Sequence, residues 1–177
     1  MADVNLDIVR NFFELNGFFV KTGSYLFVKN PEPRKVNADS FLLNAETVTT
    51  LQSAIVSIKP WHSEALFPSR INSFPELFKF LDRKALDEAR EALGNKSFQK
   101  VLVVSKLPST KQTLRKSADI LKSRGVDSVL QFPEILRFLI KQVRTNVNYT
   151  ENDILQILRI LKCCGFFGVG QLELFKK

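Results

Sequence analysis

The chain has 177 residues, a length that suffices for one well-packed domain, and its 45% hydrophobic and 25% charged residues argue against a disordered protein. Lysine and arginine outnumber aspartate and glutamate by 26 to 18, which gives a formal net charge of +8. This surplus favours polyanionic partners such as nucleic acid or an anionic membrane surface, although a solvated basic surface gives the same sum.

Cysteine and histidine are too scarce for a zinc site, because the chain contains two adjacent cysteines, Cys163 and Cys164, and one histidine, His62. No apolar run approaches the ~20 residues that a membrane-spanning helix requires. The first residues are slightly acidic and periodic, which predicts no signal peptide. Together these features favour a reducing cytoplasm and no membrane partner.

Hydrophobic periodicity predicts a helix and then three strands in the first part of the chain. Asn16 and Gly17 end the helix, because glycine tolerates the left-handed conformation of a C-cap. Gly23 and Ser24 break the first strand with a turn or kink. The predicted elements are a helix over 7–16, a first strand over 18–22 and 25–28, and further strands over 39–43 and 54–58.

The second part predicts a parallel strand–helix–strand unit followed by two helices. Before this unit, Pro75 and Glu76 suit the first turn of a helix. Thr150 and Asp153 form a capping box at the start of the last helix. The predicted elements are a helix over 74–93 in one or two pieces, a strand over 100–104, a helix over 110–124, a strand over 128–131, helices over 132–143 and 150–163, and a short strand over 171–175.

This order predicts an α/β protein with a mixed central sheet and helices on both of its faces. We expect a core over residues 1–105. Residues 106–177 would add an α/β extension and C-terminal helices to the same domain.

One polar group stands out on the predicted sheet. Because side chains alternate along a strand, Ser57 and Lys59 point one way while Val56 and Ile58 point the other. Asp39 opens the preceding strand, and a hairpin of the two strands would place Asp39 near Ser57 and Lys59. An ordinary ion pair at a strand end is the alternative interpretation.

The order of these elements resembles the PD-(D/E)XK nuclease superfamily, most closely its Holliday-junction-resolvase-like branch. The resemblance rests on Gly17-Phe18 after the first helix, the small turn Gly23-Ser24, Asp39 at a strand start, and the strand end Ser57-Ile58-Lys59. It covers about residues 7–104. It implies a restriction-endonuclease-like mixed sheet and a metal-dependent phosphodiesterase, that is, a nuclease.

In that superfamily two acids hold Mg²⁺ (or Mn²⁺) and a lysine orients the attacking water. The resemblance implies that Asp39 is a metal ligand, that Ile58 lends its carbonyl oxygen, and that Lys59 is the catalytic lysine. Ser57 replaces the second acid, so metal binding would be weak or absent. The site is then either inactive or completed by an acid from the following helix, such as Glu76. Glu64 ranks second, and the helix dipole alone also explains Glu76.

Three more residues near the motif allow a functional and a structural interpretation. His62 would contact phosphate or a metal, or lie on the surface. Trp61 would stack on a base, or pack against the next helix. Asp7 lies near where resolvase-like members carry a metal-assisting acid, and it equally suits a helix start. Phosphate contacts elsewhere would come from a set of basic residues: Lys79, Arg83, Lys111, Arg115 and Lys116.

The sequence therefore predicts a nucleic-acid-binding protein of restriction-endonuclease-like fold with a weakened or inactive phosphodiesterase site. The alternative is a non-catalytic interaction domain that binds a protein partner or a second copy of itself. No strand is followed by a glycine-rich phosphate loop, which argues against a dinucleotide-binding fold.

Overall fold

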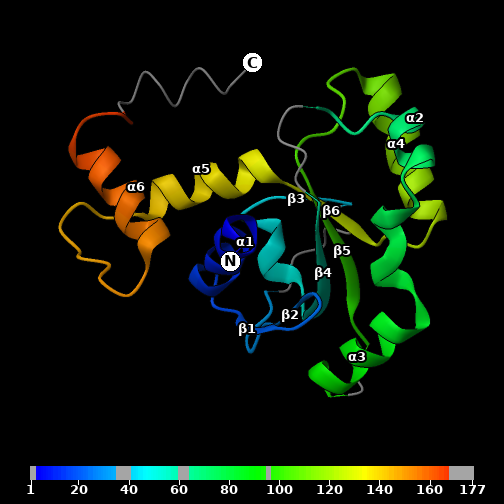
Figure 1. Cartoon of the computed structure of the whole chain (residues 1–177), viewed down its shortest axis with the longest axis horizontal. Coiled ribbons are helices and arrows are strands. Elements are labelled where there is room, and N and C mark those ends of the chain that lie inside the picture. Colours follow the sequence, from blue (N-terminus) through cyan, green and yellow to red (C-terminus); the bar gives the residue numbers. More distant parts are fainter. Residues whose placement is uncertain (1–2, 35–40, 60–63, 95–96, 168–177) are drawn as a thin grey trace.

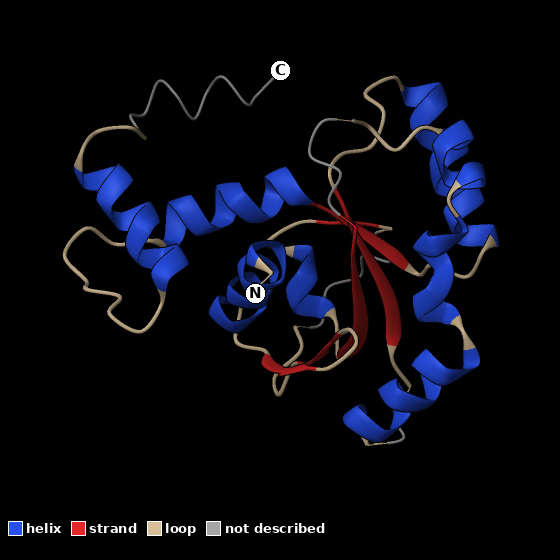
Figure 2. Ribbon diagram, in the orientation of Figure 1, coloured by secondary structure: helices blue, strands red, loops and turns tan. Residues whose placement is uncertain are grey.

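The computed structural model describes residues 3–34, 41–59, 64–94 and 97–167, in which six strands form one mixed sheet between two layers of helices (Figures 1 and 2). The strands are β1 (Phe19–Thr22), β2 (Leu26–Lys29), β3 (Leu42–Leu43), β4 (Ser53–Lys59), β5 (Gln99–Val104) and β6 (Ser128–Gln131). Their order across the sheet is β1-β2-β4-β5-β6-β3. The predicted α/β class is confirmed.

The first helix, α1 (Val4–Leu15), leads directly into the antiparallel part of the sheet. It begins at Asp3, whose carboxylate accepts a hydrogen bond from the backbone N–H of Asn5 at 3.0 Å. Gly17 follows its end with a φ of 85°, a left-handed conformation that glycine adopts without steric cost. The predicted helix end is therefore confirmed, and its start lies earlier than the sequence suggests.

Strand β4 lies inside the sheet and separates the two halves of the hydrophobic core. It runs antiparallel to β2 and parallel to β5. Because its side chains alternate, Val56 joins one cluster of buried residues and Ile55 joins the other. Because β4 is paired on both sides, the position of its last residue, Lys59, is fixed.

Helices cover both faces of the sheet (Figure 1). Helices α1 and α5 (Phe132–Gln142) lie on one side, where Phe12 and Leu139 enter the first core cluster. The other side is covered by α2 (Pro68–Ser73), the 3₁₀ helix η2 (Pro75–Leu81), α3 (Arg83–Leu93) and α4 (Lys111–Ser123). A short 3₁₀ helix, η1 (Thr47–Thr50), precedes β4. None of the helices in the described part of the chain is long and apolar enough to cross a membrane.

The C-terminal half follows the prediction closely, with one correction. Strands β5 and β6 are parallel and joined by α4, and the segment over 74–93 is divided into η2 and α3. The last helix, α6 (Asp153–Cys163), packs on α5 and begins at Asn152, whose side chain accepts from the Leu155 N–H. Asn152 therefore takes the capping position that was predicted for Thr150. The strand predicted over 171–175 lies outside the described residues.

Candidate nucleic-acid interface

The end of β4 places Lys59 at a small cavity. Ser57 is buried, with 1% of its surface exposed, and Lys59 is half-buried. The cavity measures about 120 Å³ and is lined by Asp3 and Leu6 at the start of α1, by residues 24–26 at the start of β2, and by residues 56–59 of β4. Ser57 and Lys59, two of the three residues predicted to share a polar patch, therefore both line this cavity, as does Ile58.

The strand that follows Asp39 does not pair with β4, so the predicted hairpin is wrong. Instead, β3 pairs in parallel with β6, with Leu42 opposite Val129, and both β5 and β6 separate it from β4. Both sides of β4 are occupied, one by β2 and the other by β5, which leaves no edge for β3. Asp39 itself lies outside the described residues, and its role as a metal ligand stays a prediction.

The structure brings an unpredicted acid to the cavity of Lys59. Asp3 lines this cavity while its carboxylate caps α1. Asp7, which was predicted to lie near the position of a metal-assisting acid, lies one helical turn further along and lines a separate groove. An aspartate just before an apolar periodic segment is a readable N-cap signal. Which cavity the start of a helix borders depends on tertiary packing, and local sequence does not contain that information.

Tyr25 lines the cavity, and charges on the segment that contains Glu76 affect the pKa of its phenol. Burial raises the pKa of Tyr25, and the charges of Asp82 and Glu88 raise it further, with a smaller contribution from Glu76. The phenol is therefore neutral at physiological pH. Helix η2, in which Glu76 lies, packs against β4. Glu76 is not one of the residues that line the cavity.

Glu76 has a partner of its own. Its Oε2 lies 2.7 Å from Nζ of Lys79, and this hydrogen bond raises the pKa of Lys79. Both side chains are more than half exposed. Helix-start geometry and this exposed ion pair account for Glu76 without a metal.

The described residues do not by themselves fit a Mg²⁺ or Mn²⁺ ion. No group of three or more histidine, cysteine, aspartate or glutamate side chains in the described ranges could hold a metal. At the small cavity, Asp3 offers a carboxylate that already caps a helix, and Ser57 offers a neutral hydroxyl. These ions favour several hard oxygen ligands, preferably charged ones. A complete site would therefore need acids from outside the described residues.

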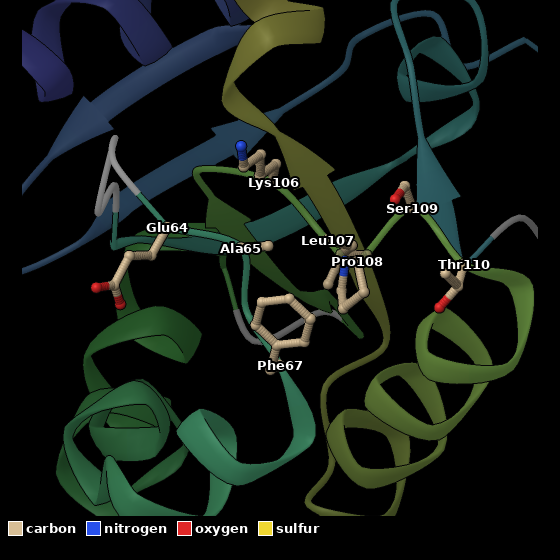
Figure 3. Close-up of a pocket in the computed structure, with 8 residues that line it drawn as sticks. All are labelled: Glu64, Ala65, Phe67, Lys106, Leu107, Pro108, Ser109 and Thr110. Carbon is tan, nitrogen blue, oxygen red and sulfur yellow. The ribbon is translucent and has the colours of Figure 1, made fainter. Parts of the chain in front are cut away.

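A larger cavity, of about 580 Å³, opens beyond the carboxyl ends of β4 and β5 (Figure 3). It is lined by residues 64, 65 and 67 after β4 and by residues 106–110 after β5. Hydrogen bonds hold these loops: the Ser105 hydroxyl donates to the Glu64 carbonyl, the Leu66 N–H donates to the Lys106 carbonyl, and the Leu107 N–H donates to the Gln131 side chain. The Phe67 ring is 49% exposed. Carboxyl ends of parallel strands are common places for ligands in α/β proteins.

Glu64, the second-ranked candidate for the missing acid, lines this larger cavity and not the small one. Its Oε2 lies 3.6 Å from Nη2 of Arg70. The structure therefore separates Glu64 from the cavity that Lys59 borders.

Three lysines lie at or just beyond the carboxyl ends of β4 and β5. Lys59 ends β4 opposite Val104 of β5, Lys106 follows two residues later, and Lys111 begins α4. Lys106 and Lys111 are exposed, and none of the three lysines forms an ion pair with a described residue. No acid among the described residues therefore neutralises their charges.

Helix α4 extends this basic surface along one of its faces. Lys111 and Arg115 are four residues apart and Lys122 follows seven residues later, so all three lie on one stripe. All three are exposed, and Lys122 also lies 4.8 Å from the centre of the Phe41 ring. Lys116 is exposed on a different face of the helix. Lys122 was missed, although helical spacing alone could have identified it.

The other two predicted phosphate contacts are partly neutralised. Lys79 is bonded to Glu76, and Nε of Arg83 lies 3.9 Å from Oδ2 of Asp87. Their charges are therefore less available than those on α4. Trp61 and His62 lie outside the described residues, and their proposed contacts stay predictions.

Comparison of the chain with family models, with curated proteins and with solved structures gives no match. The arguments for function therefore rest on the fold and on the residues themselves.

Proposed function

We propose that this protein binds nucleic acid at the carboxyl ends of β4 and β5. The surface formed there by Lys59, Lys106 and Lys111 is called the basic edge. The observation that carries the proposal is the gathering of Lys59, Lys106 and Lys111 at that edge without acidic partners among the described residues. A nucleic-acid backbone presents a dense row of negative charges, which lysines of this kind neutralise. Arg115 and Lys122, which continue the stripe on α4, would extend the contact along the nucleic-acid backbone.

The larger cavity offers a place for a base beside the phosphate contacts. The exposed Phe67 ring lies at this cavity, between the loops that follow β4 and β5 (Figure 3). Aromatic rings stack on unpaired bases with little sequence preference. An unpaired nucleotide at the end of a duplex would occupy this cavity while the lysines contact the duplex backbone.

The finer proposal is a restriction-endonuclease-like fold with a weakened or inactive phosphodiesterase site. It is supported by the resemblance described above and by the position of Lys59 beside the cavity at the end of β4. Lys59 would hold a phosphate or a water there. The single carboxylate of Asp3 and the hydroxyl of Ser57 favour binding over rapid cleavage.

The binding proposal predicts steep salt dependence. For a fluorescein-labelled duplex, the logarithm of the affinity should fall linearly with the logarithm of the salt concentration. The Lys111→Ala, Arg115→Ala, Lys122→Ala triple variant should reduce that slope by about 2.7, because each phosphate contact on a duplex contributes about 0.9. Lys116→Ala, on another face of α4, serves as the control. Flat salt dependence in the wild type would contradict the proposal and favour a protein partner.

The phosphodiesterase proposal is tested by calorimetry with Mn²⁺ and by a DNA-cleavage assay. We expect weak Mn²⁺ binding that Glu76→Gln leaves unchanged, because Glu76 is paired with Lys79 away from the cavity. Cleavage should be slow at most and lost in Lys59→Ala. Tight Mn²⁺ binding that disappears in Glu76→Gln would instead show that this acid completes the site.

A further inference from the structure

A second groove lies between α1 and the start of α6, away from the basic edge. It measures about 530 Å³. One wall is a stripe of α1 in which the lining positions 4, 7, 11 and 14 recur at helical spacing. The other wall consists of residues 150–154 and Ile157.

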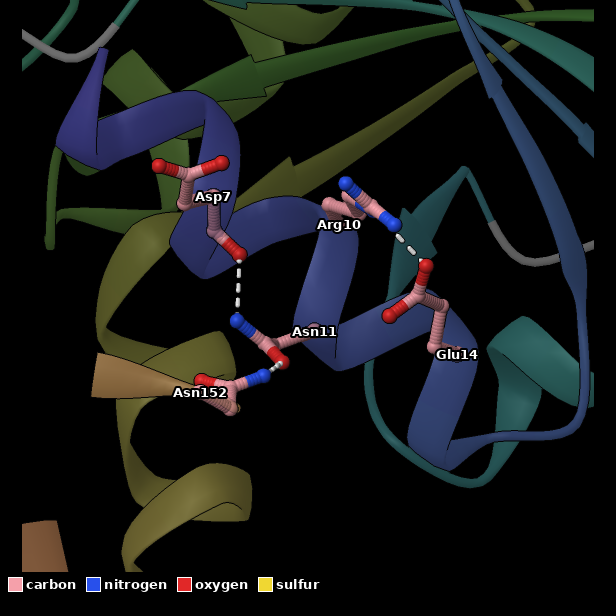
Figure 4. Close-up of polar contacts among 5 residues, drawn as sticks. All are labelled: Asp7, Arg10, Asn11, Glu14 and Asn152. Atoms are coloured by element: carbon pink, nitrogen blue, oxygen red, sulfur yellow. Dashed lines mark hydrogen bonds and ion pairs between the residues drawn. The ribbon is translucent and has the colours of Figure 1, made fainter. Parts of the chain in front are cut away.

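A hydrogen bond between Asn152 and Asn11 joins the two walls, and a second one within α1 holds Asn11 in place (Figure 4). Asn11 is 6% exposed, and its side-chain N–H donates to the Asp7 carbonyl at 2.8 Å. Its side-chain oxygen accepts a hydrogen bond from the amide of Asn152, the residue that caps α6. The groove is therefore already formed before any partner binds, which lowers the entropic cost of binding.

The groove is acidic although the chain as a whole is basic. Four carboxylates line it against a single guanidinium, that of Arg10. Arg10 is bonded to Glu14 at 2.7 Å, and this bond, with a further contribution from Asp7, raises the pKa of Arg10. The remaining carboxylates, those of Asp7, Glu151 and Asp153, form no ion pair with a described residue.

Exposed apolar side chains border these acids. Val4 on α1 is 56% exposed and Ile157 on α6 is 55% exposed, and both line the groove. Ile160, one turn further along α6, is 50% exposed. Ile157 and Ile160 lie on the face of α6 opposite Leu155, the residue that packs into the core. An apolar stripe beside unpaired acids is typical of a surface that binds a partner of opposite charge.

We propose that this groove docks a basic, amphipathic segment of a protein partner. The lysines or arginines of the segment would pair with Asp7, Glu151 and Asp153, and its apolar side chains would cover Ile157 and Ile160. Nucleic acid does not fit, because phosphates would meet the carboxylates. This proposal does not rest on nucleic-acid binding at the basic edge, and the two surfaces can be tested separately.

The test uses a fluorescein-labelled amphipathic peptide of leucine and lysine, measured by anisotropy against the full chain. The Asp7→Asn, Glu151→Gln double variant should weaken binding roughly three- to tenfold, because each exposed charge pair contributes modestly. Glu91→Gln with Asp119→Asn removes the same charge from exposed positions on α3 and α4 and should leave affinity unchanged. Ile157→Ser should weaken binding as well, which separates docking from general charge attraction.

Two outcomes would overturn the proposal. Equal losses in the groove variant and in the control variant would mean that the peptide responds only to net charge. A dimer in sedimentation experiments that Ile157→Ser dissociates would assign the groove to a second copy of the chain. Binding of a labelled DNA duplex serves as the separate readout of the basic edge, and the groove variants should not weaken it.

Discussion

Replacing Phe12 with alanine is expected to lower the free energy of unfolding by about 3–5 kcal/mol, the usual cost of removing a buried phenylalanine. Phe12 is fully buried, and its ring makes edge-to-face contacts with Phe13 and Phe138, at 5.4 and 5.1 Å between ring centres. The contact with Phe138 joins α1 to α5. Its loss leaves a cavity between these helices, in addition to the lost transfer free energy.

Urea denaturation of wild type and variant would measure this loss. Phe166, which is 61% exposed, provides the matched control, because Phe166→Ala should change the free energy of unfolding by less than about 0.5 kcal/mol. Similar small effects at both positions would contradict the packing of α1 on α5. Since α1 also brings Asp3 to the cavity of Lys59, such a result would remove one wall of the candidate site.

Removing Lys59 and Lys106 together is expected to weaken nucleic-acid binding and to lower its salt dependence. Neither lysine has an acidic partner among the described residues, and both lie at the carboxyl ends of adjacent parallel strands. The Lys59→Ala, Lys106→Ala double variant should lower the salt slope for a duplex by about 1.8, from two phosphate contacts at about 0.9 each. Folding should be little affected, because partly exposed lysines without ion pairs contribute little to stability.

Much of the fold could be predicted from the sequence, because local signals determine it. Asn16-Gly17 ends a helix for steric reasons, and the apolar runs of β4 and β5 are bounded by polar residues and turns. The strand–helix–strand unit β5-α4-β6 could also be predicted. A helix with short connections carries the chain back along the sheet, so the strand that follows it runs parallel to the strand before it. These elements are found where periodicity places them.

The position of β3 could not be predicted in the same way. Only Leu42 and Leu43 form this strand, and two apolar residues are compatible with pairing to any open edge. The choice depends on which edges remain after β2 and β5 have paired with β4, which is a non-local property of the sheet. The predicted hairpin with the Asp39 segment failed for this reason.

The candidate site shows the same division between local and non-local information. Strand alternation correctly places Ser57 and Lys59 on one face of β4, and helical spacing would have added Lys122 to the stripe on α4. The contribution of Asp3 depends on how α1 packs against the sheet, and the position of Lys59 opposite the end of β5 depends on the register of β4 with β5. Neither can be derived from spacing along the chain.

The most direct test of nucleic-acid binding at this edge is the anisotropy of a fluorescein-labelled duplex at several salt concentrations, compared between two double variants of equal charge. The first is Lys59→Ala, Lys106→Ala. The second is Lys29→Ala, Lys141→Ala, in which Lys29 lies opposite Ser53 at the far end of β4 and Lys141 lies exposed on α5. We predict that the first variant loses affinity at least tenfold and about 1.8 of the salt slope, while the second retains both. Equal losses in the two variants, or no loss in the first, would contradict the proposed interface.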